Sequence, residues 1–296
     1  MIEGNLSRVS LCRDELGDDP VVRNRLAEGA TVRMTEIVCF EDQRSFRPTV
    51  SATVRDTPQL TVLLVRAGGF LLRKNGHEEF IDPTTCFVLR QGDETSVSHP
   101  VHASEVSTLL EISWDLYDDA LPLGVSPGVP VTADLDLSHR SLISVCRVGV
   151  DQFEVSERVQ DLLAKMSGQL GPVSTGRRAP TVVAHRRLVN EVRAILNDGP
   201  LTKSLEELSH RAACSPTHLS RVFRLVTGQT LTSYRNQLRV RGVIEELVAG
   251  QSLRVLAAKY GFTDQAHMTR VFRQHAGEVP TAVRAMLQPT VEPRER

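Results

Sequence analysis

The sequence predicts an α+β fold in two parts: a β-rich first half that ends in a pair of helices, and an all-α second half of about seven helices. Short β-type runs separated by turn residues fill residues 31–114. From Leu137 onward the apolar residues recur with the spacing of a helix rather than of a strand. An eight-residue segment then occurs twice, at residues 217–224 and 266–273, in a region dense in helix-capping residues.

The first half contains several short strands joined by tight turns. The β-type runs comprise residues 60–66, 70–74, 77–81 and 104–113. Two of them flank Asn75-Gly76, the dipeptide most typical of a two-residue hairpin. Turn signals spaced about 8–12 residues apart are typical of a small β-barrel or a β-sandwich. Residues 115–134, rich in Pro and Gly, are expected to form a loop.

Two amphipathic helices and a linker follow the strands. The apolar stripe of the second helix consists of Val155, Val159, Leu162, Leu163 and Met166. Such a stripe either covers the β-rich domain or pairs two subunits, and the second alternative leads us to expect a homodimer. Residues 168–180 are rich in Gly, Pro and Ser and predict a linker.

Charge divides the chain unevenly. Residues 181–296 hold 17 Lys and Arg against 10 Asp and Glu, which leaves 18 basic and 26 acidic residues for residues 1–180. A basic domain joined to an acidic one is typical of a nucleic-acid-binding domain attached to a different domain. The alternative is an unrelated choice of surface charges in two soluble domains.

Several classes of protein are excluded by the sequence. The five cysteines are scattered and form no C-x-x-C pair, so neither a disulfide framework nor a zinc site is expected. The first residues lack a basic and then apolar signal peptide, and no apolar run approaches the ~18 residues of a membrane span. We therefore expect a cytoplasmic protein without a membrane segment or a cofactor.

The repeated segment has the pattern of a helix that presents one polar face. Residues 217–224 (THLSRVFR) and 266–273 (AHMTRVFR) are identical at five of eight positions, and Gly228 and Gly277 follow at the same offset. The face opposite the apolar one is mostly polar and carries Thr217, Ser220, Arg221 and Arg224 in the first copy and Gln265, Ala266, Thr269, Arg270 and Arg273 in the second. Arg pairs with guanine, Gln with adenine, and later arginines suit phosphates. The alternative is a duplicated fold whose solvated helix faces bind nothing.

The second half resembles the DNA-binding domain of the AraC/XylS family of bacterial transcription regulators. The resemblance runs from about residue 182 to 287 and is closest at residues 257–262 (AAKYGF) and 264–273. It implies two helix–turn–helix modules joined by a long helix, each placing one helix in the major groove. By position, the implied base-reading residues are Thr217, Ser220, Arg221, Gln265, His267, Thr269 and Arg270, and the arginines expected at phosphates are Arg224 and Arg273. The chain departs from the family at Gly242, Val243 and Ala276, which leaves the packing of the connecting helix in question.

The first half is similar to the cupin-like sensor barrel of that family only at residues 90–93 and 98–100. His77, His99 and His102 invite a metal interpretation, but the paired histidines and following glutamate of a cupin metalloenzyme are absent. We therefore expect neither a metal nor catalysis.

The sequence thus predicts a transcription regulator that binds specific sites on double-stranded DNA. We divide it into a cupin-like sensor and dimerisation barrel (1–150), a helix and linker (151–180), an AraC-type DNA-binding domain (181–288) and a tail (289–296). A small effector bound to the first domain is the expected control, and RNA polymerase is a further candidate partner. The alternatives are control by a protein partner, with a barrel that only dimerises, and a cupin-type enzyme fused to a DNA-binding domain.

Overall fold

The structure is a computed structural model. It describes residues 22–25, 31–39, 50–53, 59–74, 76–89, 93–98, 105–113, 128–148, 152–169 and 180–288. Its strands are β1 (Val22–Arg25), β2 (Thr31–Cys39), β3 (Val50–Thr53), β4 (Gln59–Ala67), β5 (Phe70–Lys74), β6 (His77–Ile81), β7 (Thr85–Leu89), β8 (Glu94–Ser98), β9 (Glu105–Ser113) and β10 (Val129–Pro130). Its helices are α1 (Ala133–Val148), α2 (Gln152–Ser167), α3 (Pro180–Asn197), α4 (Leu205–Arg211), α5 (Pro216–Thr227), α6 (Leu231–Leu247), α7 (Leu253–Lys259), α8 (Gln265–Ala276) and α9 (Pro280–Leu287).

The strands form two open antiparallel sheets, so the prediction of a closed barrel is wrong. One sheet has the order β1-β2-β9-β4-β7-β10 and the other β3-β8-β5-β6, and within the described residues no ladder joins their edge strands. The chain crosses between the sheets at Gly68-Gly69 and again at the turn after β6. Gly69 is required there, because an added Cβ would lie 2.5 Å from the carbonyl oxygen of Ile81.

The inner strand β4 carries an unbroken apolar run at residues 62–65 because both of its faces are buried there. Leu60, Val62 and Leu64 belong to the core shared with α1 and α2. Leu63 and Val65 face the other sheet and pack in a separate cluster. A strand covered on both sides loses the alternation of apolar and polar residues that marks a half-exposed strand.

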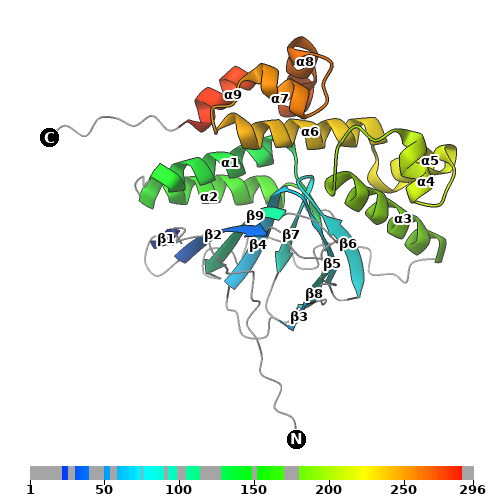
Figure 1. Cartoon of the computed structure of the whole chain (residues 1–296). Coiled ribbons are helices and arrows are strands. Elements are labelled where there is room, and N and C mark those ends of the chain that lie inside the picture. Colours follow the sequence, from blue (N-terminus) through cyan, green and yellow to red (C-terminus); the bar gives the residue numbers. More distant parts are fainter. Residues whose placement is uncertain are drawn as a thin grey trace, which may run out of the picture.

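Helices α1 and α2 lie side by side on the larger sheet (Figure 1), and together with the two sheets they are called the β domain below. The predicted stripe of α2 is almost completely buried, from Val155 at 3% exposure to Met166 at 0%, in the same core as β4. The stripe therefore covers the sheet of its own chain, which removes the reason for assigning the dimer contact to it. The loop expected over residues 115–134 also contains β10 and the start of α1.

Helices α3 to α9 are the seven helices predicted for the second half. The predicted caps are present: Ser204 and Glu207 form a capping box, and Ser215, Ser252 and Asp264 each accept a backbone N–H. Gly228 and Gly277 end α5 and α8 with positive φ angles of 73° and 81°. Local capping chemistry was therefore sufficient to place these helices.

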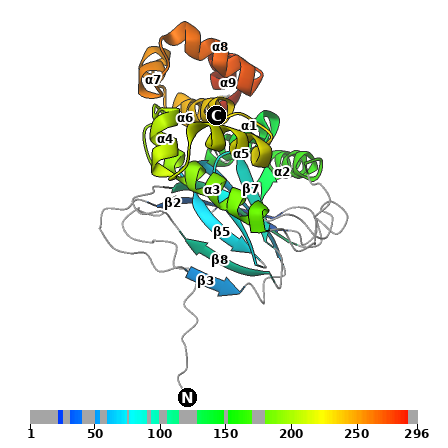
Figure 2. The ribbon, with the colours of Figure 1, turned by 90° about the vertical axis from the view of Figure 1, so that its right-hand side faces the viewer.

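The long helix α6 belongs to two separate cores. Its first half packs with α3, α4 and α5, which we call the first module, and its second half packs with α7, α8 and α9, the second module. Figures 1 and 2 show both modules on the same end of the β domain, with α6 lying across it. Helix α6 contacts β4, α3 contacts β6, and α1 contacts α8 and α9.

Gly242, a departure from the family pattern, has a packing reason. A Cβ at this position would lie 2.2 Å from Cε1 of Tyr260, the C-cap of α7. The Tyr260 hydroxyl donates a hydrogen bond of 2.5 Å to Glu246, which holds the ring against α6. The glycine lets α6 and α7 approach closely.

Candidate nucleic-acid interface

Helix α5 presents a polar face because its apolar residues are fixed in the core. Its N-terminus is set by Ser215, whose side chain accepts from His218 N at 3.2 Å, and by Pro216 in the first turn. Leu219, Val222 and Phe223 are fully buried in the first module. The predicted residues Thr217, Ser220, Arg221 and Arg224 are consequently exposed on one side of the helix.

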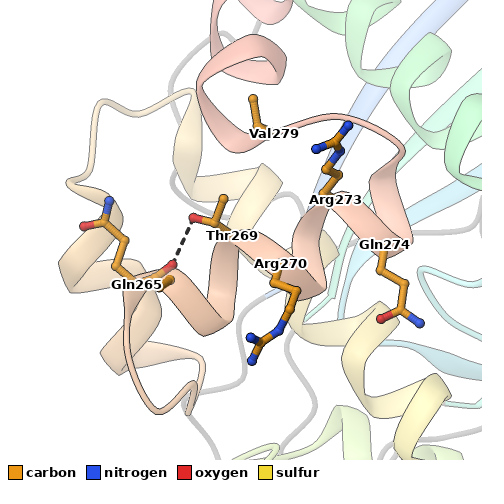
Figure 3. A pocket seen from close by; sticks show the side chains of 7 residues that line it. Gln265, Thr269, Arg270, Arg273, Gln274 and Val279 are labelled. Atoms are coloured by element: carbon orange, nitrogen blue, oxygen red, sulfur yellow. Dashed lines mark hydrogen bonds between the residues drawn. The ribbon is translucent and has the colours of Figure 1, made fainter.

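Helix α8 repeats this arrangement in the second module. Asp264 accepts from His267 N at 2.7 Å, and Met268, Val271 and Phe272 face the core. Gln265, Arg270 and Arg273 are exposed, whereas Thr269 is half-buried and donates its hydroxyl to the Gln265 carbonyl at 2.9 Å. Figure 3 shows this bond and, further along the helix, the side chains of Arg270 and Arg273, which point to opposite sides of the view.

Each exposed face lines an open groove. The groove beside α5 has a volume of about 600 Å³ and contains all four predicted residues of that helix. The groove beside α8 has a volume of about 830 Å³ and contains Gln265, Thr269, Arg270 and Arg273. The residues that the repeat singled out are therefore gathered on two surfaces, one on each module.

The four arginines of these surfaces make no ion pair or hydrogen bond within the described part of the chain. Most other arginines of the structure are partnered, for example Arg140 with Asp136 and Glu245. An exposed guanidinium without a carboxylate partner keeps all of its donors free for a phosphate or a base edge. Both surfaces are therefore positively charged, and their arginines have hydrogen-bond donors free for a ligand.

His267 has a different environment from the other predicted base-reading residues. Its Nδ1 lies 3.2 Å from the Thr263 hydroxyl, and its ring packs edge-on to Phe262 with the centroids 5.7 Å apart. It is half-buried and does not line the groove beside α8. These contacts stabilise the turn between α7 and α8.

The sequence interpretation missed residues that other elements bring to the grooves. Thr230, Thr232 and Arg235, from the start of α6, line the groove beside α5, and Gln274 lines the one beside α8. Nε of Arg235 is buried and has no partner among the described residues. The only available signal was a basic residue one turn beyond the N-cap of the connecting helix, which is weak without the fold.

The metal and sensor residues considered in the first half lie mostly outside the described residues, including residues 90–92, His99 and His102. Among the described residues no group of three or more His, Cys, Asp or Glu is placed to hold a metal ion. No helix of the described segments is long and apolar enough to span a membrane.

Known proteins match the second half of the chain. A family model described as a helix-turn-helix domain matches residues 208–286. The multiple antibiotic resistance protein MarA of Escherichia coli (strain K12) is 33% identical over 73 residues, which are 24% of this chain and 58% of MarA. The probable transcription factor PqrA of Proteus vulgaris is 30% identical over 81 residues, 27% of this chain and 66% of PqrA. The chain thus spans only part of each of these relatives.

A solved structure with more extensive coverage is ToxT from Vibrio cholerae O395. The likeness covers 87% of this chain and 98% of the ToxT chain, with 11% identity and a TM-score of 0.35. The family match runs from the end of α4 into α9 and includes both exposed helices, α5 and α8. Residues 208–286 therefore form an AraC-type helix-turn-helix domain, and the relatives MarA and PqrA support the resemblance to AraC/XylS regulators.

Proposed function

We propose that this chain is a transcription regulator that binds a specific two-part site on double-stranded DNA. The observation that carries the proposal is the pair of equivalent helices, α5 and α8, each with two exposed and unpartnered arginines facing a groove. A major groove admits one α-helix, and two such helices on one domain suit two successive groove segments.

Within each helix we assign the contacts by position. Arg221 and Arg270 lie one turn from the helix start, and we assign them to base edges together with Thr217, Ser220, Gln265 and Thr269. Arg224 and Arg273 lie a turn further along and are assigned to phosphates. We add Arg235 to the phosphate set, because it lines the same groove as Arg224. His267 is left out of the base-reading set because its ring is engaged with Thr263 and Phe262.

The test is binding of the full-length protein to a duplex obtained by selection from random DNA. Affinity should fall steeply with salt, with a log–log slope near −0.9 per phosphate contacted. Arg224→Ala and Arg273→Ala should each make that slope shallower by about 1. The matched control is Arg254→Ala, because Arg254 is exposed on α7 but lines neither groove. Binding that is absent or insensitive to salt would refute the proposal.

We further propose that the β domain receives the signal that controls DNA binding, through a small effector. Support comes from its contacts with both modules, since α3 contacts β6 and α1 contacts α8 and α9. A homodimer and contact with RNA polymerase remain predictions. Thermal-shift screening with small metabolites tests the effector: a true ligand raises the melting temperature and changes the affinity for DNA. Control by a protein partner would be favoured if no metabolite acts and a partner co-purifies.

A further inference from the structure

One carboxylate of the β domain contacts two helices of the first module. Asp82, in the turn between β6 and β7, is completely buried. Arg193 of α3 donates its Nε to Asp82 at 3.0 Å, and the Tyr234 hydroxyl of α6 also donates to it. Thr84 donates two hydrogen bonds of 2.7 Å to Asp82, and Nδ2 of Asn197, also on α3, donates to it at 3.4 Å.

The same contact is extended by the rest of the Arg193 guanidinium. Nη1 of Arg193 donates to Glu79 at 3.0 Å, and Nη2 donates to the Thr85 hydroxyl at 2.6 Å. Together with Nε, all three guanidinium nitrogens therefore donate to β6, β7 or the turn between them. Burial alone would raise the pKa of Asp82, but the Arg193 charge and the hydrogen bonds outweigh it and hold that pKa below its ordinary value. The pair is therefore ionised and defines one orientation of α3 against the sheets.

A second carboxylate joins the other half of α6 to the β domain. Glu245 accepts from Arg66 of β4 at 2.8 Å and from Arg140 of α1 at 2.5 Å. Arg241, one turn earlier, donates to the carbonyl of Val131 at 2.5 Å. The second module is tied to α1 as well, because the Ser144 hydroxyl donates to the Leu287 carbonyl at the end of α9.

These contacts form one stripe along α6. Tyr234, Arg241 and Glu245 recur at intervals of seven and four residues, so they lie on the same face of the helix. Arg239 lies on a different face, where its guanidinium donates to the Leu201 carbonyl and stacks 5.6 Å from the Phe262 ring centroid. The two modules are thus held together by α6 and Arg239, and the β domain contacts both of them along the remaining face.

We propose that Asp82 and Glu245 are positioning residues through which the β domain braces the two modules and sets the distance between α5 and α8. Buried ion pairs contribute little net stability, but their hydrogen-bond geometry tolerates only one arrangement, which suits a brace. The exposed faces of α5 and α8 stay uncovered in this arrangement. On DNA, the brace fixes the spacing of the two half-sites, a consequence that rests on the proposed function. The residues that set the spacing would then never touch DNA.

The direct test is a distance measurement in the full-length protein without DNA. Spin labels are attached through a non-natural keto amino acid at positions 225 and 255, where the native side chains are 70% and 52% exposed on α5 and α7. The unmutated protein should give one narrow distance distribution. Asp82→Asn and Glu245→Gln, which keep the side-chain shape and remove the charge, should broaden or shift it.

A matched control and a milder substitution accompany the Asp82→Asn and Glu245→Gln variants. Glu191→Gln changes a charge on the exposed face of α3 and should leave the distribution unchanged. Tyr234→Phe removes one donor to Asp82 but keeps the ring in the core of the first module, so it should broaden the distribution less than Asp82→Asn. If the Asp82→Asn variant fails to fold, the distance distributions of the Tyr234→Phe and Glu245→Gln variants decide the test. Unchanged distributions in every folded variant would overturn the proposal.

The spacing consequence is tested on DNA with one base pair inserted between the half-sites. The unmutated protein should lose about tenfold in affinity, within the range of typical coupling between sites. The Asp82→Asn variant should lose only about threefold in affinity or less, because its two modules can change their spacing to match the longer site. An equal loss in both proteins would overturn the spacing claim. If no protein binds DNA, the proposed function fails, while the distance measurement still tests the brace.

Discussion

Replacing Gly242 by alanine should destabilise this protein, although the same change stabilises most helices. Alanine in a helix interior is favoured over glycine by about 1 kcal/mol. Here the new Cβ would lie 2.2 Å from Cε1 and 2.6 Å from Cζ of Tyr260, whereas ordinary carbon contacts are about 3.5–4.0 Å. The ring must therefore retreat by more than 1 Å, which breaks its hydrogen bond to Glu246.

The expected changes in the free energy of unfolding follow from these contacts. Overpacking of this kind costs about 1–3 kcal/mol, and a lost hydrogen bond costs about 1 kcal/mol more. After subtracting the helix gain, Gly242→Ala should lower the free energy of unfolding by about 1–3 kcal/mol in urea denaturation. In a Tyr260→Ala background the same change should instead raise it by about 1 kcal/mol. The coupling free energy between the two positions is then about 2–4 kcal/mol. An increase in unfolding free energy both in the unmutated protein and in the Tyr260→Ala background would refute this account of Gly242.

Three further outcomes concern the core, a cap and pH. Leu162→Ala should cost about 2–5 kcal/mol of unfolding free energy, because Leu162 is fully buried against the sheet; a variant that stays stable and changes only its oligomeric state would contradict that placement. Asp264→Ala removes the N-cap of α8 and should cost about 1 kcal/mol of unfolding free energy, which thermal melting can measure against Glu278→Ala, a control that removes an exposed carboxylate and should leave the melting temperature unchanged. Burial, with the charges of Arg140 and Arg66, holds the pKa of His139 well below its ordinary 6.5, so the unfolded chain alone takes up a proton and stability should fall by about 1 kcal/mol between about pH 7 and 5.5; a flat profile would show that His139 takes up a proton in the fold as readily as in the unfolded chain.

The helical half of the fold could be predicted closely because its signals are local. Ser215-Pro216 starts α5 and Gly277 ends α8 through hydrogen bonds and backbone angles that involve only neighbouring residues. The exposed face of each helix followed from the repeat itself, since the apolar positions of both copies had to share a core. Most of the candidate site was therefore visible in the sequence.

The rest depends on contacts between residues far apart in the chain. The apolar stripe of α2 was identified correctly, but an apolar face does not reveal whether its own sheet or a second subunit covers it. Short antiparallel strands are equally compatible with a barrel and with two open sheets, because closure depends on which edges meet. Asp82 precedes Pro83, a pair typical of ordinary turns, and its partner Arg193 lies 111 residues away. No local sequence pattern predicts a contact between residues so far apart in the chain.

The most direct measurement of the central claim is a comparison of binding sites selected from random DNA by the full-length protein and by two variants. The unmutated protein should select a site with two separated conserved parts. Arg221→Ala should relax the base preference in one part and Arg270→Ala in the other, each at a cost of about 1–3 kcal/mol in binding free energy. Selection of a single short part, or loss of the same base preference in both variants, would contradict DNA reading by α5 and α8 together.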